Sequence, residues 1–246
     1  MFCGSLIRSG NNAKTVKGDG IFETAIMYLA PSDISGRNVC PMAKTAMCEQ
    51  ACLYSAGRGA FNYVQAARIA KAKRYHANRA LFMAQLAEDC AGFVAYCKRK
   101  GVKPAIRLNG TSDIQWEVSH PVTRDGTEYA SIFDAFPEIT YYDYTKLVKR
   151  VYRKLPVNYS LVLSYSNANP DYARSVVAAH NDTGCNVAVV FRDKATRSRY
   201  METGFDGATV IDGDRDDLRF NDPRGVVVGL YAKGKAKADQ SGFVID

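Results

Sequence analysis

Short apolar runs recur along the chain and are separated by stretches in which apolar and polar residues follow a helical spacing. The apolar runs are residues 21–29, 104–108, 139–144, 159–164, 186–191, 209–211 and 225–230. The string VAVVF at 187–191 is wholly apolar, which is typical of a parallel strand buried on both faces of its sheet. These runs therefore predict a core of parallel strands.

The stretches between the runs predict helices. Phe82, Leu86, Cys90, Phe93 and Cys97 recur at steps of three and four, so they share one face of a helix. The expected helical regions are 62–100, with a break near His76, and 129–136, 146–155 and 170–180. Strands that alternate with helices form right-handed β–α–β units. We therefore expect an α/β fold, a parallel (β/α) barrel, complete or partial, with about six or more strands.

Length and composition favour one domain. The 246 residues, 47% of them hydrophobic, are enough for one large core. We expect a single barrel-like domain over 1–246, in which 1–20 is a polar N-terminal extension and 30–60 a cysteine-containing loop. No apolar run is long enough to span a membrane, and the N-terminus lacks the apolar core of a signal peptide. The expectation is a cytoplasmic protein with no membrane partner.

Polar residues gather where the expected strands end. In parallel α/β folds the active site lies at the carboxyl ends of the strands, so these residues predict one polar mouth. The candidates for cofactor binding are Asn109, Ser112, Asp113, Ser164, Ser166 and Asn167. The candidates for catalysis are Asp113, Asp143, Lys146, Asp212 and Asp214. Loops are usually polar, so a series of ordinary turns is the alternative.

Three cysteines cluster in the loop after the first expected strand. Cys40, Cys48 and Cys52 have the spacing C-x7-C-x3-C, and three thiolates can bind a [4Fe–4S] cluster or zinc. Zinc would need a fourth ligand, and His76 is the nearest histidine. Ordinary reduced thiols are the alternative. The chain has seven cysteines, an odd number, and no export signal, so a disulfide framework is not expected.

The position of this loop resembles that of the cluster-binding loop in radical S-adenosylmethionine enzymes. The resemblance implies that Cys40, Cys48 and Cys52 hold a [4Fe–4S] cluster beside S-adenosylmethionine. The segment 109–113 would then hold the methionine amine, and Ser164, Ser166 and Asn167 the ribose. The spacing departs from the C-x3-C-x2-C of that family, and Ala51 stands where an aromatic residue usually precedes the last cysteine.

A second resemblance runs along nearly the whole chain. Its strings are NVCP, ACLYSAGRG, RLNGTSDI, YDYTK, DGDRDDLRF and GLYAKGKAK. They are similar to an uncharacterised family of bacteriophage and mobile-element proteins. The resemblance implies expression in the cytoplasm of an infected bacterial host, and it implies no reaction.

The net charge of +8 and the pI of about 9.1 suit an anionic partner such as DNA or RNA. No acidic residue lies between Glu49 and Glu88, while basic and aromatic residues are interleaved there. The candidate nucleic-acid-binding residues are Arg58, Arg68, Lys71, Lys73, Arg74, Tyr54 and Tyr63. Cations can neutralise phosphates, and aromatic rings can stack on unpaired bases. A solvated helix face is the alternative.

Carboxylates at strand ends suggest a further kind of site. Asp212 and Asp214, joined by Asp113 and Asp143, could bind Mg²⁺ as in nucleases. A charged loop held by internal Asp–Arg pairs is the alternative.

Three functional hypotheses follow. The first is a phage-type enzyme, radical-SAM-like with an iron–sulfur cluster, that acts on a nucleotide, nucleic acid or other anionic substrate. The second is a non-catalytic protein that binds nucleic acid or a host partner, with structural or zinc-bound cysteines. The third is a Mg²⁺-dependent nuclease that uses Asp113, Asp143, Asp212 and Asp214.

Overall fold

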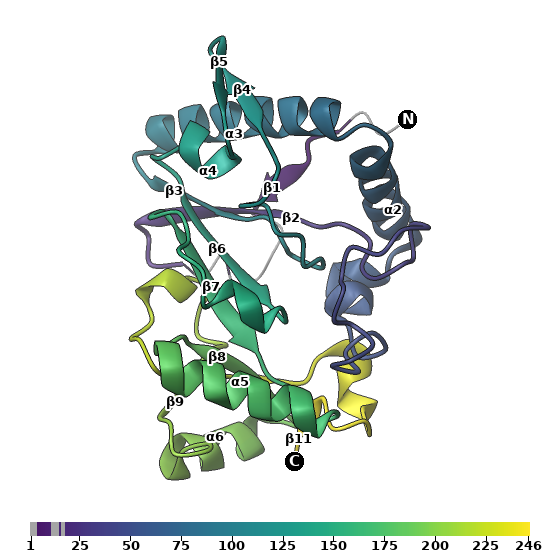
Figure 1. Ribbon diagram of the computed structural model, residues 1–246, viewed down its shortest axis with the longest axis vertical. Helices are drawn as coiled ribbons and strands as arrows, with labels where there is room; N and C mark the ends of the chain where they lie inside the picture. The colour runs from purple at the N-terminus through teal and green to yellow at the C-terminus, as the bar shows by residue number, and fades with distance from the viewer. Residues whose placement is uncertain (1–3, 11–14, 16–17) are drawn as a thin grey trace. The chain divides into compact units, whose positions relative to one another are not determined.

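The computed structural model of the chain describes residues 4–10, 15 and 18–246 (Figure 1). Its main sheet has nine strands in the hydrogen-bonded order β1-β2-β3-β6-β7-β8-β10-β9, with β11 also paired to β8. These strands are β1 (Ile7–Ser9), β2 (Phe22–Met27), β3 (Lys103–Arg107), β6 (Thr140–Thr145), β7 (Tyr159–Ser164), β8 (Val187–Phe191), β9 (Val210–Asp212), β10 (Val227–Tyr231) and β11 (Val244–Ile245).

The remaining elements are helices and one hairpin. The hairpin pairs β4 (Val122–Arg124) with β5 (Thr127–Tyr129). The α-helices are α2 (Asn62–Ala77), α3 (Arg79–Lys100), α4 (Ile132–Ala135), α5 (Pro170–Thr183) and α6 (Lys194–Thr203). Short 3-10 turns are η1 (Leu53–Ser55), η2 (Gly57–Ala60), η3 (Val148–Arg150), η4 (Arg219–Asn221) and η5 (Gly234–Ala238).

The expected barrel is wrong. The strand pairs β2–β3, β3–β6, β7–β8, β8–β10 and β9–β10 are parallel, as expected for buried apolar strands, but β1 pairs with β2 in the antiparallel direction. A barrel closes only when its two edge strands pair with each other. Here β1 and β9 end the strand order, and no pairing joins them within the part of the chain that the structure describes.

Two expected helices are also replaced. The region 129–136 contains the end of the hairpin and only the short α4. The region 146–155 contains only the turn η3, in which Arg150 is fully buried. Leu147 is buried too, and Val148 packs against a hydrophobic cluster. Tertiary packing therefore overrides the local pattern, because a helix of this length is marginal by itself.

The chain divides into two compact units, which are described separately. Unit 1 comprises residues 1–39, 66–143 and 155–160, and unit 2 comprises residues 40–65, 144–154 and 161–246. In unit 1, the hairpin lies beside α3 (Figure 1). In unit 2, α6 packs beside β9 and β10. Two of the chain's strands, β6 and β7, contribute residues to both units.

Aromatic side chains form much of the core of unit 1. Trp116 is fully buried, and its ring lies 6.2 Å from that of Phe82. Tyr75 contacts His120 through a hydrogen bond of 2.8 Å between the hydroxyl and Nε2. Burial lowers the pKa of His120 to about 4. This histidine is therefore neutral near pH 7 and acts as a core residue.

The core of unit 2 lies between the sheet and α5. Val189 on β8 and Val176 on α5 are fully buried in one cluster, and Ala46 from the cysteine-containing loop joins it. The N-cap residue Asn169 fixes the start of helix α5. The side chain of Asn169 accepts hydrogen bonds from the N–H groups of Asp171 and Tyr172 at 3.0 and 3.1 Å. Pro170 occupies the first turn, where no backbone donor is needed.

Candidate functional site

The structure places the polar strand-end residues in two different units. Asn109, Ser112, Asp113 and Asp143 belong to unit 1. The other candidates belong to unit 2, and they are Cys40, Cys48, Cys52, Lys146, Ser164, Ser166, Asn167, Asp212 and Asp214. Each unit therefore has its own set of polar residues at the ends of parallel strands.

Lys146 and Ser164 form a direct pair in unit 2. Lys146 follows the last residue of β6, and Ser164 is the last residue of β7. The Nζ of Lys146 donates to the Oγ of Ser164 at 2.6 Å, and both residues are half-buried. The carbonyl of Ser164 accepts from the hydroxyl of Tyr172 at 2.6 Å, which fixes the end of β7 to helix α5. The pair is thus held in place and still reaches solvent.

Phe243 supports the lysine of this pair. The Nζ of Lys146 lies 4.8 Å from the centre of the Phe243 ring, a cation–π contact. Phe243 is buried, and its neighbour Gly242 accepts a hydrogen bond from the N–H of Asn167 at 3.0 Å. A side chain at Gly242 would meet the backbone of Ala168 at 3.2 Å, so only glycine fits there without a shift. The C-terminal segment is therefore packed directly against the end of β7.

Ser166 anchors the cysteine-containing loop to the same edge of the sheet. It is fully buried, and its hydroxyl donates to the carbonyl of Ala46 at 2.7 Å. Its oxygen also accepts from the N–H of Ala168 at 3.3 Å. Because both functions of the hydroxyl are used inside the protein, Ser166 positions the loop. The predicted role of Ser166 was cofactor binding.

The cysteine-containing loop packs against a second hydrophobic cluster of unit 2 near its last cysteine, Cys52. Ala51 packs in a cluster that contains Ala232, Ala236 and Phe243. Cys48 packs against this cluster and also against the cluster that contains Ala46. The thiol-bearing loop and the Lys146–Ser164 pair consequently share one neighbourhood, at the carboxyl ends of the strands of unit 2.

The three thiols do not form a ready-made metal site. Cys40, Cys48 and Cys52 are each half-buried, and the Sγ of Cys48 lies 3.7 Å from the carbonyl of Ala43. Among the residues that the structure describes, no group of three or more His, Cys, Asp or Glu side chains is arranged to hold a metal ion. The iron–sulfur cluster and zinc therefore stay predictions from the sequence, and we assign no chemical step to such a group.

In unit 1, Asn109 is the centre of a buried hydrogen-bond network. Its side-chain oxygen accepts from Ser112 Oγ at 2.9 Å, from the N–H of Ile114 at 2.9 Å and from Trp116 Nε1 at 3.1 Å. Its side-chain nitrogen donates to the carbonyl of Ile114 at 2.9 Å and to Asp143 at 3.2 Å. The capacity of this amide is filled by the protein, so its role here is structural.

Asp143 on β6 and Gly110, in the loop after β3, complete that scaffold. Asp143 is fully buried and accepts from the N–H of Asn109 at 2.7 Å and from the hydroxyl of Tyr159 at 3.0 Å. A side chain at Gly110 would lie 2.7 Å from the carbonyl of Met27, so the loop packs tightly onto β2. Asp113 is also buried, and its N–H donates to Val39 at 2.8 Å.

Asp212 and Asp214 in unit 2 are engaged with basic side chains. Arg197 forms ion pairs with both carboxylates, and Lys233 pairs with Asp214 at 2.6 Å. The N–H of Tyr231 also donates to Asp214, at 3.0 Å. Arg197 and Lys233 lie outside the acidic loop, whereas Arg219 inside it pairs with Asp216 and Asp222, as the alternative of internal Asp–Arg pairs expects. The four carboxylates expected for Mg²⁺ are divided between the two units.

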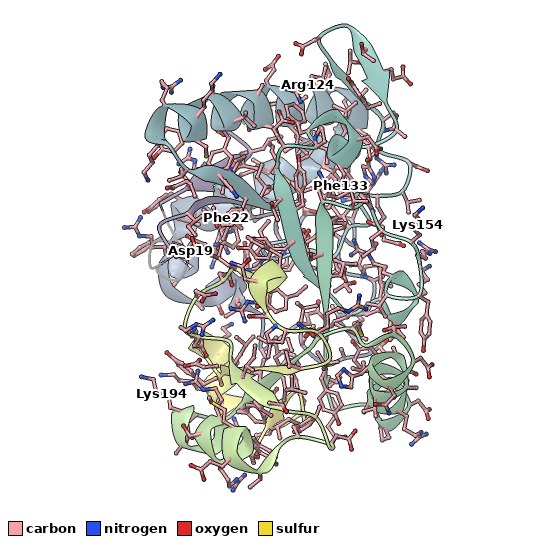
Figure 2. The ribbon with its side chains drawn as sticks, turned by 90° about the vertical axis from the view of Figure 1, so that its left-hand side faces the viewer. Asp19, Phe22, Arg124, Phe133, Lys154 and Lys194 are labelled. Atoms are coloured by element: carbon pink, nitrogen blue, oxygen red, sulfur yellow. The ribbon has the colours of Figure 1, made fainter. Side chains whose placement is uncertain are left out.

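Cations surround Tyr231 next to these carboxylates. The Nζ of Lys233 lies 4.7 Å from the ring centre, and Lys194 Nζ and Arg197 Cζ each lie 5.7 Å from it. Lys194 begins α6 and points away from the body of the protein (Figure 2). Since Arg197 and Lys233 also pair with Asp214, their charge at these strand ends is balanced by a carboxylate.

The basic stretch is less exposed than sequence reasoning expected. Arg68 and Lys71 are buried, and both are on the part of α2 that belongs to unit 1. The guanidinium of Arg68 lies 4.6 Å above the ring of Tyr28, and Lys71 donates to the carbonyl of Leu6 at 2.9 Å. Burial lowers the pKa of Lys71 to about 8. Neither side chain is available to a phosphate in this arrangement.

The other candidates of this stretch reach solvent to different degrees. Arg58 and Lys73 are exposed, while Arg74 and Tyr54 are half-buried. Tyr63 is exposed, and its ring stacks on that of Phe61, which is also exposed. Phe243 and Tyr172 were missed altogether. No sequence signal marked Phe243, because the strand that follows it, β11, has only two residues.

Comparison with known proteins gives one family match. A family model described as gene product 88 matches residues 5–246. No curated protein and no solved structure matches the chain. Within the described residues, no helix combines the length and apolar character needed to cross a membrane.

Proposed function

The chain belongs to the gene product 88 family, a phage-type family, and we propose that it binds a phosphate-bearing ligand, a nucleotide or a nucleic acid, through Lys146 and Ser164. The observation that carries the proposal is the 2.6 Å contact between Lys146 Nζ and Ser164 Oγ at the ends of two strands. Ligands of open α/β sheets bind outside the carboxyl ends of the strands.

The chemistry of the pair suits an anion. The oxygen of Ser164 accepts from the ammonium group, so the hydroxyl proton of the serine is directed to another acceptor. A phosphate oxygen beside the pair would receive that proton and the positive charge of Lys146. The ammonium group of Lys146 lies over the face of the Phe243 ring, a contact that holds the cation beside Ser164.

The radical S-adenosylmethionine hypothesis is not needed for this proposal. The family match does not extend to that class of enzymes, and the three cysteines are not arranged as a ligand set. The iron–sulfur cluster therefore stays a prediction from sequence. Anaerobic purification followed by iron analysis and an absorbance spectrum tests it separately.

The binding proposal is tested with pyrophosphate and ATP by isothermal titration calorimetry. Lys146→Met should weaken both by about tenfold to a hundredfold, since a hydrogen bond to a charged group contributes about 1.5–3 kcal/mol. Lys149→Met is the matched control, because Lys149 is exposed in the same unit and carries the same charge. Unchanged binding by Lys146→Met, or an equal loss in Lys149→Met, would contradict the proposal.

A further inference from the structure

Two aromatic rings are exposed at the start of helix α2, in unit 2. Phe61 is 51% exposed and Tyr63 is 72% exposed. Their rings are stacked, with centres 5.7 Å apart and planes 9° from parallel. Aromatic side chains usually bury most of their large area. A stacked pair left in water therefore marks a surface that is suited to binding another ring or another molecule.

The backbone around the pair is fixed. The N–H of Phe61 donates to the carbonyl of Arg58 at 3.3 Å, which closes η2. The carbonyl of Phe61 then accepts from the N–H groups of Val64 and Gln65 at 3.0 and 3.1 Å, which begins α2. The side chain of Gln65 also donates to the carbonyl of Gly59 at 2.9 Å. Such a platform loses little freedom when it binds a partner.

The charge near the pair favours a nucleic acid as that partner. Arg58 is exposed one turn before Phe61, and no acidic residue occurs between Glu49 and Glu88. An aromatic face stacks on any unpaired base, and a neighbouring arginine contacts the phosphate or adds a cation–π contribution. Bases within a duplex are already stacked on each other, so a single strand is the form that the pair would recognise.

We infer that Phe61 and Tyr63 stack on unpaired bases of a single-stranded nucleic acid, with Arg58 at its phosphates. The inference rests on the proposed function, because it narrows the phosphate-bearing ligand to a single strand.

The test measures fluorescence anisotropy at low salt with three labelled probes of about 15 nucleotides. The probes are an oligothymidine strand, a duplex and an abasic strand that keeps the phosphates and lacks the bases. The unchanged protein should bind the oligothymidine strand more tightly than the other two. Phe61→Ala and Tyr63→Ala should each weaken that binding roughly five- to hundredfold.

Matched controls separate stacking from other effects. Tyr152→Ala removes another exposed tyrosine of unit 2 and should leave binding unchanged. Tyr63→Phe keeps the ring and should retain most of the affinity. Melting temperatures should stay close to that of the unchanged protein, since both rings are exposed.

Failure of this inference differs from failure of the proposed function. If the abasic strand binds as well as oligothymidine, or if both alanine variants bind normally, the aromatic pair does not stack on bases, even where Lys146→Met still loses pyrophosphate. If no strand binds to folded protein, the inference is overturned and the exposed pair is assigned to a protein partner. If Lys146→Met keeps pyrophosphate while Phe61→Ala loses oligothymidine, the proposed function fails and the stacking surface stands.

Discussion

Two sets of polar residues that look alike in the sequence have different surroundings in the two units. In unit 1, Asn109 makes hydrogen bonds to Ser112, Ile114, Trp116 and Asp143, all inside the protein. In unit 2, Lys146 and Ser164 are half-buried and contact each other at 2.6 Å. Position at a strand end is thus shared by a scaffold and a candidate site, and the two differ in burial, since Asn109 is buried while Lys146 and Ser164 reach solvent.

The largest effect is expected from breaking the scaffold of unit 1. Asn109→Ala removes the acceptor of Ser112, Ile114 and Trp116 and leaves buried donors without a partner. We expect a loss of about 3–5 kcal/mol in the free energy of unfolding, measured by urea denaturation. Asn181→Ala on the exposed face of α5 is the control and should change the free energy by about 0.5 kcal/mol or less. A loss equal to that of the control would mean that the network does not stabilise unit 1.

A pH effect should come from the histidine in the core of unit 1. The pKa of His120 lies at about 4 in the folded protein, below its usual 6.5, chiefly because of burial. The unfolded chain therefore binds the proton first, and stability is complete above pH 6.5 and falls as the pH drops toward 4. The loss should reach about 3 kcal/mol.

Urea denaturation at several pH values measures this loss, and His120→Gln should remove most of the slope between pH 6.5 and 4. His180→Gln is the control. A slope that persists in His120→Gln would assign the titration to other groups.

Lys71 should give a pH dependence of the same sign, at higher pH. Burial lowers its pKa from 10.5 to about 8, so the folded state gives up the proton more readily than the unfolded chain. Stability should therefore rise as the pH increases from about 8 to about 10.5. The gain is on the order of 3 kcal/mol. Lys71→Met should remove it, while the exposed Lys73→Met should keep it. Equal slopes in both variants would exclude Lys71 as the source.

The smallest expected effect is a loss of ligand affinity at the candidate site of unit 2. Ser164→Ala removes one hydroxyl at the candidate site and should weaken pyrophosphate binding about fivefold, which corresponds to about 1 kcal/mol. The melting temperature should change little, because the residue is half-buried. Ser198→Ala, at an exposed position of α6, is the control. A large drop in the melting temperature without a change in affinity would place Ser164 in a scaffold like that of Asn109.

Local patterns predicted much of the secondary structure. Each of the seven apolar runs overlaps a strand, and the expected helix break near His76 is real. It occurs because the side chain of Asn78 accepts from the N–H of Leu81 at 3.0 Å and so begins α3. The order of strands could not be read in this way. It depends on pairings between distant segments, and β1 lies in a stretch that looked like a polar extension.

The candidate site was predicted in part. Lys146 and Ser164 follow from their position at strand ends, whereas Phe243 comes from a distant segment that no local pattern marks. The burial of Arg68 and Lys71 also escaped prediction. Helix α2 is rich in alanine, so its apolar residues define no clear face, and the sequence does not show which cations point inward.

The hydrogen bond between Ser166 and Ala46 has a consequence for how the protein is made. It joins residues 120 positions apart, and unit 2 is assembled from three separate stretches of chain. Contacts of such long sequence separation form late, because a large loop must close first. During synthesis, residues 40–65 leave the ribosome long before their partners in 161–246 exist. The thiols of Cys40, Cys48 and Cys52 are therefore exposed in the nascent chain until residues 161–246 have been synthesised. The rate at which these thiols become less reactive toward an alkylating reagent reports the completion of unit 2.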